Sequence, residues 1–263
     1  DIERILKING ELPFSGADTL TFSRLWMDEG EKKQDNQGND IRPKQVEYVG
    51  KQTVYFKDSL GYQTEPYAFY FESGDNTLTL KAVNERVIIC KMTLTPIVKY
   101  PTYEEYLSAQ PSVSMTAAGQ NYLQKIQGED SVLRSSPSLY ARYDRSSPET
   151  EPYSVSNTIL NYIGGDPWTH PGEWIEWEID VPEDGYYNIT IKARQMYQRG
   201  ALSARTLYID GEVPFAAMEA VEFSYNTSWE MRTLADANGT PYNFFLKKGT
   251  HRIRLEGTMG KMG

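Results

Sequence analysis

A loop rich in glycine and proline carries the residues best suited to bind a ligand. Residues 161–172 read Asn-Tyr-Ile-Gly-Gly-Asp-Pro-Trp-Thr-His-Pro-Gly, so Trp168 has Asp166 and His170 on either side. A tryptophan in such a loop is poorly placed for a hydrophobic core. An indole face packs against the C–H patches of a sugar ring, and nearby polar groups bind its hydroxyls. The loop therefore predicts a sugar-binding platform, and the alternative is a Trp168 side chain that plugs the domain edge.

A second loop adds an aromatic ring and a cation. Residues 195–200 join two predicted strands and direct Tyr197 and Arg199 outward, and Arg194 and Arg205 flank this loop. A guanidinium stacks on rings or donates two hydrogen bonds to vicinal hydroxyls or to a carboxylate. For each arginine taken alone, an ion pair with a neighbouring acid is the better account. The predicted carbohydrate-binding residues are Asp166, Trp168, His170, Arg194, Tyr197 and Arg199.

Catalytic chemistry has weaker support in the sequence. Glu173, Glu176 and Glu178 form a run of acids, and Glu176 and Glu178 would share one face of a strand. A glycosidase places two carboxyl groups about 5–10 Å apart across a cleft. Nothing else in the sequence marks a cleft, no serine stands in a G-x-S-x-G setting, and the chain has two histidines. We expect a solvated strand face and no enzymatic activity.

The composition excludes several classes of partner and site. The 263 residues include 36 acids against 27 Lys and Arg, and this net charge of −9 disfavours binding to nucleic acid. A single cysteine, Cys90, excludes an internal disulfide framework and a cysteine zinc site. No apolar run approaches the ~18–20 residues of a membrane span. The chain opens Asp-Ile-Glu-Arg, as an excised or processed piece would, so a missing signal peptide does not imply an intracellular location.

Two blocks of sequence occur twice and in the same order. Ile-Asn-Gly-Glu-Leu-Pro-Phe at 8–14 returns as Ile-Asp-Gly-Glu-Val-Pro-Phe at 209–215, and a Pro-Tyr block at 66–71 returns at 241–246. The first copy continues into a strongly strand-like segment at 86–94, which has no counterpart after the second copy. Matched order and matched turn residues predict a duplicated module whose first copy is incomplete at its N-terminus.

Strand patterns dominate the rest of the chain. Residues 174–181 alternate apolar and polar side chains, a turn follows at 182–185, and 186–193 is the returning strand. Trp174 and Trp177 lie three residues apart and so face opposite sides of their strand, with Trp177 favoured for the core. These patterns predict an all-β fold, an antiparallel β-sandwich of the jelly-roll type.

The two predicted modules are joined by a connection with helical character. Residues 102–107 have Thr102 at the N-cap and acids in the first turn, which predicts a short helix. The predicted limits are a first β-sandwich module at 1–98, a linker at 99–125, and a second module at 126–263 that lacks its last strand.

The second module resembles a known family over residues 126–255. Its motifs resemble, in the same order, those of galactose-binding-like carbohydrate-binding modules of families six and thirty-five. The matching segments are Ile-Gln-Gly-Glu-Asp at 126–130, Gly-Glu-Trp-Ile-Glu-Trp at 172–177, Pro-Glu-Asp-Gly-Tyr-Tyr at 182–187, Ile-Asp-Gly at 209–211 and Lys-Gly-Thr-His-Arg-Ile at 248–253. The resemblance implies a galactose-binding-like jelly roll.

The resemblance also implies a structural calcium ion. In that family the opening acids hold calcium against a carboxylate near the end of the domain, which here makes Glu129 the ligand. Gln127 replaces the usual first glutamate, and the closing strand would lie beyond Gly263. The alternative is that Glu129 and Asp130 are solvated acids at the start of a strand.

Tandem copies joined by a Tyr-rich helix look like modules of large extracellular proteins of Gram-positive bacteria. Those proteins include solute-binding components of sugar importers and surface glycoside hydrolases. The resemblance therefore implies a non-catalytic carbohydrate-binding region, part of a larger secreted or cell-surface polypeptide, that binds a glycan or oligosaccharide. The alternative is a structural spacer or protein–protein interaction module with the same fold and no sugar site.

Overall fold

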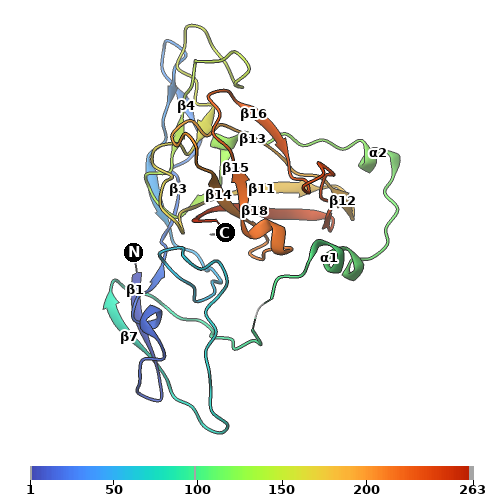
Figure 1. Cartoon of the computed structure of the whole chain (residues 1–263). Helices are drawn as coiled ribbons and strands as arrows, with labels where there is room; N and C mark the ends of the chain where they lie inside the picture. The colour runs from blue at the N-terminus through green and yellow to red at the C-terminus, as the bar shows by residue number, and fades with distance from the viewer. Residues whose placement is uncertain (1, 98, 261–263) are drawn as a thin grey trace.

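The computed structural model describes residues 2–97 and 99–260, in which strands are the main regular elements (Figure 1). The largest unit is a seven-stranded antiparallel sheet with the order β15-β14-β18-β11-β8-β3-β6. Its strands are β15 (Val221–Phe223), β14 (Ser203–Ile209), β18 (Gly249–Thr258), β11 (Trp174–Val181), β8 (Leu133–Arg134), β3 (Leu25–Asp28) and β6 (Gln45–Tyr48). The all-β, antiparallel class predicted from the sequence is confirmed.

Short strand pairs form a second layer over the long strands β11 and β18. In Figure 1 β13 and β16 lie above these strands, and β12 lies at their far end. The pairs of this layer are β13 (Thr190–Ala193) with β16 (Glu230–Thr233) and β12 (Gly185–Tyr187) with β17 (Phe244–Leu246). Two further pairs are β9 (Ala141–Arg142) with β10 (Tyr162–Ile163), and β4 (Lys33–Gln34) with β5 (Asp40–Ile41). The jelly-roll connectivity and the tandem arrangement stay predictions.

A three-stranded sheet repeats part of the large one. β1 (Ile2–Ile8) pairs with β2 (Leu20–Phe22) and β7 (Leu78–Asn84), just as β14 pairs with β15 and β18. Each copy turns through two residues with positive φ, 52° and 87° at Asn9 and Gly10, and 52° and 87° at Asp210 and Gly211. Each turn leads to a short 3₁₀ helix, η1 (Ser15–Asp18) or η3 (Ala216–Glu219). The repeated sequence block therefore specifies the same local backbone in both places.

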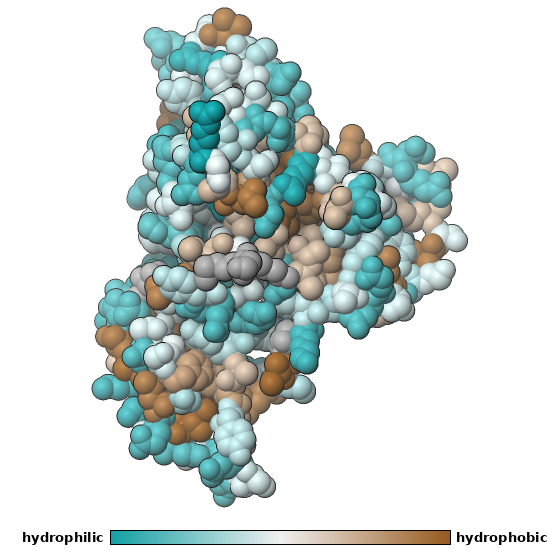
Figure 2. Space-filling view, in the orientation of Figure 1, coloured by the Kyte–Doolittle hydropathy of each residue, from teal (hydrophilic) through white to brown (hydrophobic). Residues whose placement is uncertain are grey.

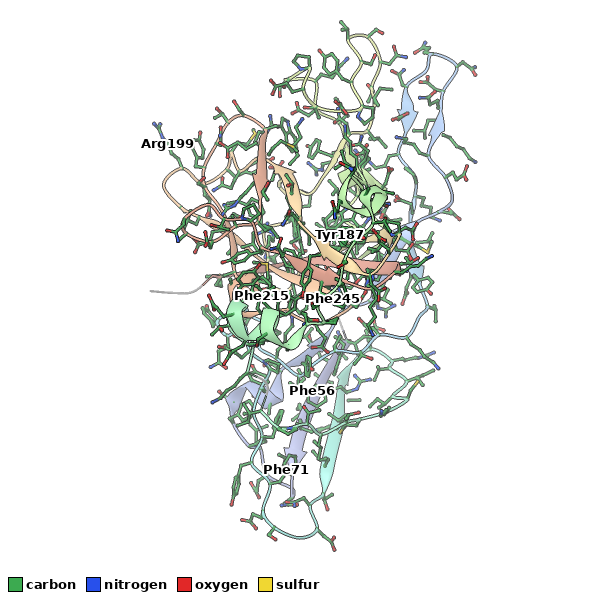
Figure 3. All side chains as sticks on the ribbon, turned by 90° about the vertical axis from the view of Figure 1, so that its right-hand side faces the viewer. Phe56, Phe71, Tyr187, Arg199, Phe215 and Phe245 are labelled. Atoms are coloured by element: carbon green, nitrogen blue, oxygen red, sulfur yellow. The ribbon has the colours of Figure 1, made fainter. Side chains whose placement is uncertain are left out.

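Each copy packs its own hydrophobic cluster. The first contains Leu6, Ala17 and Leu20 with Phe56 against them, and the second contains Phe215, Phe244 and Leu207 among others. Figure 3 shows Phe56 in the lower unit and Phe215 in the upper one. Burial of a large apolar side chain contributes about 1.5–3 kcal/mol, so each cluster stabilises its own sheet.

Residues of the first copy also join the large sheet. β3 pairs with β8 through Trp26 and Arg134, and β6 extends the sheet beyond β3. Residues 25–48, which fall within the predicted limits 1–98, thus lie beside a strand of residues 126–263. Those limits stay predictions.

The strand predicted at 86–94 is not formed. Its residues are all exposed, and Ile88 has 91% of its surface accessible. Apolar β-branched residues favour a strand only where a neighbouring strand supplies hydrogen bonds and side-chain contacts. No such neighbour lies beside these residues in the described part of the chain.

The predicted linker helix is present and packs on the second copy. α1 (Tyr103–Ala109) begins after Thr102, whose side chain accepts from the Glu105 N–H while Glu105 accepts from the Thr102 N–H. The Tyr103 ring packs against the Phe215 ring in a tilted arrangement, with ring centroids 5.0 Å apart. A second helix, α2 (Ala117–Gln120), has four residues. No helix in residues 2–97 or 99–260 has the length and apolar character needed to cross a membrane.

Candidate functional site

A cavity of about 1180 Å³ lies between the large sheet and the layer of short strands. Its floor is formed by β11 and β18, its roof by β13 and residues near β16, and its rim by the loops 161–172 and 195–200. Figure 2 shows apolar residues gathered in the hollow between these layers. The two loops predicted to bind sugar lie at the rim of this cavity, and the cavity itself lies between the layers.

Strand alternation decides which tryptophan of β11 faces the cavity. Trp177 lines the cavity and its indole N–H donates to the Gly128 carbonyl at 2.8 Å. Trp174 faces the other side, is 3% exposed, and lies under the Arg254 guanidinium at 3.9 Å from the ring centroid. The predicted opposite orientation is confirmed, and Trp174 is buried because a neighbouring side chain covers it.

Trp168 lines the cavity in a fixed position. Its indole N–H donates to the Glu173 carbonyl at 2.9 Å, and the Arg205 guanidinium lies 4.3 Å from its ring centroid. Gly164, with φ +91°, lies so close that an added Cβ would be 2.9 Å from the ring. Trp168 is half-buried, so part of the predicted platform is already covered.

Tyr197 and Asp166 bring the two predicted loops together. Tyr197 is 54% exposed and lines the same cavity as Trp168. Burial raises the pKa of Tyr197, and hydrogen bonding to Asp166 raises it further. Asp166 also lies 3.8 Å from Arg142. A ring and a carboxylate from separate loops therefore meet at the cavity rim.

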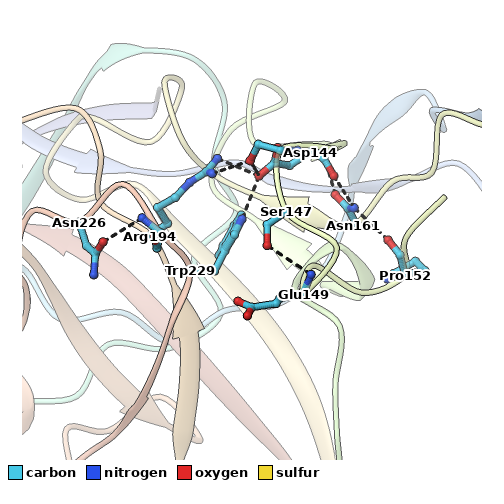
Figure 4. A network of polar contacts seen from close by, with 10 residues as sticks. Asp144, Ser147, Glu149, Pro152, Asn161, Arg194, Asn226 and Trp229 are labelled. Atoms are coloured by element: carbon cyan, nitrogen blue, oxygen red, sulfur yellow. Dashed lines mark hydrogen bonds and ion pairs between the residues drawn. The ribbon is translucent and has the colours of Figure 1, made fainter. Parts of the chain in front are cut away.

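Arg194 belongs to a polar network that holds the loops in place (Figure 4). It forms an ion pair with Asp144 at 3.0 Å, and the Trp229 indole N–H donates to the same carboxylate at 2.9 Å. Burial alone would raise the pKa of Asp144. Hydrogen bonds from Ser146 and Trp229, together with the positive charge of Arg194, outweigh burial and lower this pKa. Asn161 donates to the Asp144 carbonyl at 2.9 Å. The ion pair is the alternative that the sequence left open for Arg194.

The two remaining predicted residues are exposed. His170 lines the cavity rim, and its backbone N–H donates to the Glu173 carboxylate at 3.3 Å. Arg199 is not among the cavity-lining residues and points away from the body of the molecule in Figure 3. Five of the six predicted residues thus border one cavity, and Arg199 does not.

The acids of β11 are paired by arginines. Glu176 is 6% exposed and accepts from Arg254 at 2.7 and 2.9 Å, and Glu178 forms an ion pair with Arg252 at 2.8 Å. The two acids share the strand face turned away from the cavity, as predicted. The expectation of a solvated face is wrong for Glu176, because Arg252 and Arg254 of the paired strand β18 cover it.

Glu129 is buried without a partner for one carboxylate oxygen. It is 5% exposed, and Oε2 has no hydrogen bond. Desolvation raises the pKa of Glu129 to about 7. Calcium takes about 6–8 oxygen ligands, and the described residues contain no group of three or more His, Cys, Asp or Glu that could hold a metal. The fit is incomplete, so calcium at Glu129 stays a prediction.

The aliphatic part of the cavity was not among the features predicted from the sequence. Ile189 and Ile191 project into it, together with Ile253 and Leu255 of β18. The alternation of 186–193 and of 249–258 could have indicated which residues face inward. Nothing in the sequence indicated that the two inner faces leave space between them.

Comparisons with known proteins give matches to solved structures only: no family model and no curated protein matches the chain. A cycloisomaltooligosaccharide glucanotransferase of Paenibacillus sp., complexed with cycloisomaltoheptaose, is 22% identical with a TM-score of 0.37, over 53% of this chain and 17% of that one. A family 35 carbohydrate binding module from Clostridium thermocellum is 16% identical with a TM-score of 0.36, and the match covers 51% of this chain and 85% of that one. A Podospora anserina GH26-CBM35 β-(1,4)-mannanase is 15% identical with a TM-score of 0.34, and the match covers 51% of this chain and 24% of that one.

Proposed function

We propose that the chain is a non-catalytic carbohydrate-binding region and that the cavity rim is its glycan site. The observation that carries this proposal is the convergence of Tyr197 and Asp166, from two separate loops, beside Trp168. The exposed ring of Tyr197 offers a face for sugar C–H groups, and Asp166 and His170 offer hydrogen bonds to hydroxyls. The fixed ring of Trp168 limits how deeply a sugar can enter.

Binding at this site is weak in our proposal. A sugar hydroxyl exchanges hydrogen bonds with water for hydrogen bonds with protein, and the net gain per bond is about 0.5–1.5 kcal/mol. One stacked ring and a few such bonds correspond to a Kd on the order of 10–100 µM. Several sites on one polypeptide would raise the effective affinity.

The wider setting follows from the resemblance of residues 126–255 to carbohydrate-binding modules. In this proposal the chain is a pair of β-sandwich modules within a larger secreted or surface-anchored polypeptide of a Gram-positive bacterium. It holds a glycan close to a sugar importer or a glycoside hydrolase. These points are supported by the sequence motifs alone. A glycan array that contradicts glycan binding would contradict them as well.

A glycan array on the chain and two variants tests the proposal. We expect Tyr197→Ala to weaken glycan binding at least about tenfold, because stacking is lost and 1.4 kcal/mol corresponds to tenfold. Trp168→Ala should weaken it too, since the rim loses the ring that orients loop 161–172. Tyr70→Ala is the control, because Tyr70 is 82% exposed and belongs to the first copy.

Three outcomes would contradict this function. Binding unchanged in both rim variants places the site elsewhere. Absence of binding to every glycan on the array favours the structural spacer. Release of smaller sugars from a bound glycan, measured by chromatography, shows that the chain is an enzyme.

A further inference from the structure

The cavity between the layers is large and mostly walled by hydrocarbon. Its volume of about 1180 Å³ exceeds the ~300–1,000 Å³ of common small-ligand pockets. Beneath the rim its walls are Ile179 of β11, Ile253 and Leu255 of β18, and Ile189 and Ile191 at β13. Protein interiors are packed at crystal-like density, and unfilled apolar space costs stability. An apolar occupant would therefore be stabilised here.

Among the described residues, one half-buried cation on the cavity wall has no counter-ion. Arg205 forms no ion pair with any described residue, and its guanidinium donates only to neutral groups, the Ser203 hydroxyl and the carbonyls of Ala204 and Trp168, at 2.7–3.1 Å. Its Nε has no partner at all. Burial lowers the pKa of Arg205 to about 10, an effect that the charge of Glu173 only partly offsets. A half-buried charge without a counter-ion favours the binding of an anion.

The acids on the cavity wall already have partners. Asp166 lies beside Arg142 and Tyr197, Glu151 is paired with Lys125, and Asp180 accepts from the Thr250 hydroxyl at 2.7 Å. Lys192 also lines the cavity without an ion pair, but it is exposed and donates to the Glu149 carbonyl. Within residues 2–97 and 99–260, Arg205 is thus the half-buried lining charge that a ligand can neutralise. It stands under Trp168, between the polar rim and the aliphatic interior.

We propose that the cavity binds a long-chain carboxylate. The hydrocarbon chain lies between β11 and β13, and the carboxylate accepts hydrogen bonds from the Arg205 guanidinium beside Trp168. This site is distinct in its chemistry from the glycan site at the rim, because it takes an anion with a hydrocarbon tail. Each methylene buried contributes up to about 0.8 kcal/mol, which is about fourfold in affinity.

Isothermal titration of the chain with octanoate, decanoate and dodecanoate, each below its micellar concentration, measures this directly. We expect the affinity to rise two- to fourfold for each added methylene. Dodecyl maltoside and dodecyltrimethylammonium carry the same tail on a neutral and a cationic head, and we expect both to bind at least tenfold more weakly than dodecanoate. No binding of dodecanoate, or an affinity independent of chain length, overturns the proposal. Equal affinities for dodecanoate, dodecyl maltoside and dodecyltrimethylammonium would contradict the proposal that Arg205 binds the carboxylate.

Two variants on one strand test the location. Ile179→Trp fills the cavity and should weaken dodecanoate binding at least tenfold. Glu178→Trp, its matched control, places the same ring on the opposite face of β11 and should leave binding within twofold. Unchanged binding in Ile179→Trp overturns the cavity as the site, whatever the glycan array shows.

Two substitutions of Arg205 test the role of its charge. Because two ligands are compared within each variant, the result does not depend on how much of the variant is folded. Arg205→Lys should retain the preference for dodecanoate over dodecyl maltoside. Arg205→Met should lose this preference while keeping the gain per methylene, because the apolar walls are unchanged. A persistent preference in Arg205→Met shows that another group binds the carboxylate and contradicts the proposal.

Discussion

Replacing Arg134 by methionine is expected to lower the free energy of unfolding by about 3–5 kcal/mol. The Arg134 side chain is fully buried, and its two terminal nitrogens bind both oxygens of Asp28 at 2.7 and 2.8 Å. It also donates to Gln45 at 2.5 Å and to the Ser131 hydroxyl at 2.9 Å. Methionine fills the space but leaves the Asp28 carboxylate without its cation. Urea unfolding monitored by circular dichroism gives the change in free energy.

Arg24→Met is the matched control for this substitution. Arg24 precedes β3 and forms ion pairs with Glu47 and Glu85 at 2.8 and 2.6 Å, but all three side chains are 31% exposed or more. Exposed ion pairs contribute about 0–1 kcal/mol, so we expect a small change. Adding Asp28→Leu to Arg134→Met should recover part of the lost stability, because both charges are then removed. Equal effects of Arg24→Met and Arg134→Met would show that the buried pair does not secure β3 to β8.

Local features of the fold could be predicted because they depend on neighbouring residues. The Asn-Gly and Asp-Gly turns require positive φ at both positions, and the structure has it in both copies. Thr102 and Glu105 form a capping box, so the start of α1 follows from four consecutive residues. The alternation in 174–181 specifies β11 and the opposite faces of its two tryptophans.

Pairings between distant segments could not be predicted in this way. β3 joins β8 across more than 100 residues, and the contact depends on Arg134, which stands in a segment with no distinctive pattern. Segment 86–94 shows the reverse case, since its residues suit a strand but no neighbour is present among the described residues. Strand propensity reports a preference for a half-buried pleated surface and cannot supply the partner.

The residues of the candidate site could be named from the sequence, but their contacts could not. The sequence placed Asp166 and Trp168 on one loop and Tyr197 on another, and the structure brings all three to one cavity rim. It could not tell which arginine has an acidic partner, because that depends on side chains far along the chain. Arg194 has Asp144, 50 residues earlier, and Arg205 has no acid within ion-pair distance among the described residues.

Folded-state stability is expected to fall as the pH rises from about 5 to 7, because the Glu129 carboxyl ionises in the unfolded chain while burial keeps it protonated in the folded one. Its pKa is raised from 4.5 to about 7 in the folded state. The neutral acid is favoured on folding, so the contribution is fully present below pH 4.5, declines as the pH rises above 4.5, and is gone once the pH has passed the folded pKa of about 7. At about 1.4 kcal/mol per pH unit, the loss is on the order of 3 kcal/mol. Urea unfolding of the chain at pH 5, 6, 7 and 8 measures this slope.

Glu129→Gln separates protonation from metal binding at the same position. Glutamine cannot ionise, so this variant should show a flatter pH dependence and should exceed the original chain in stability at pH 8. Asp130→Asn is the control, because Asp130 is exposed on the same 3₁₀ segment. Stabilisation of the original chain by calcium at pH 8, absent in Glu129→Gln and reversed by a chelator, would instead identify Glu129 as a calcium ligand. A pH slope identical in both proteins would contradict a buried proton at Glu129, since no other substitution separates them.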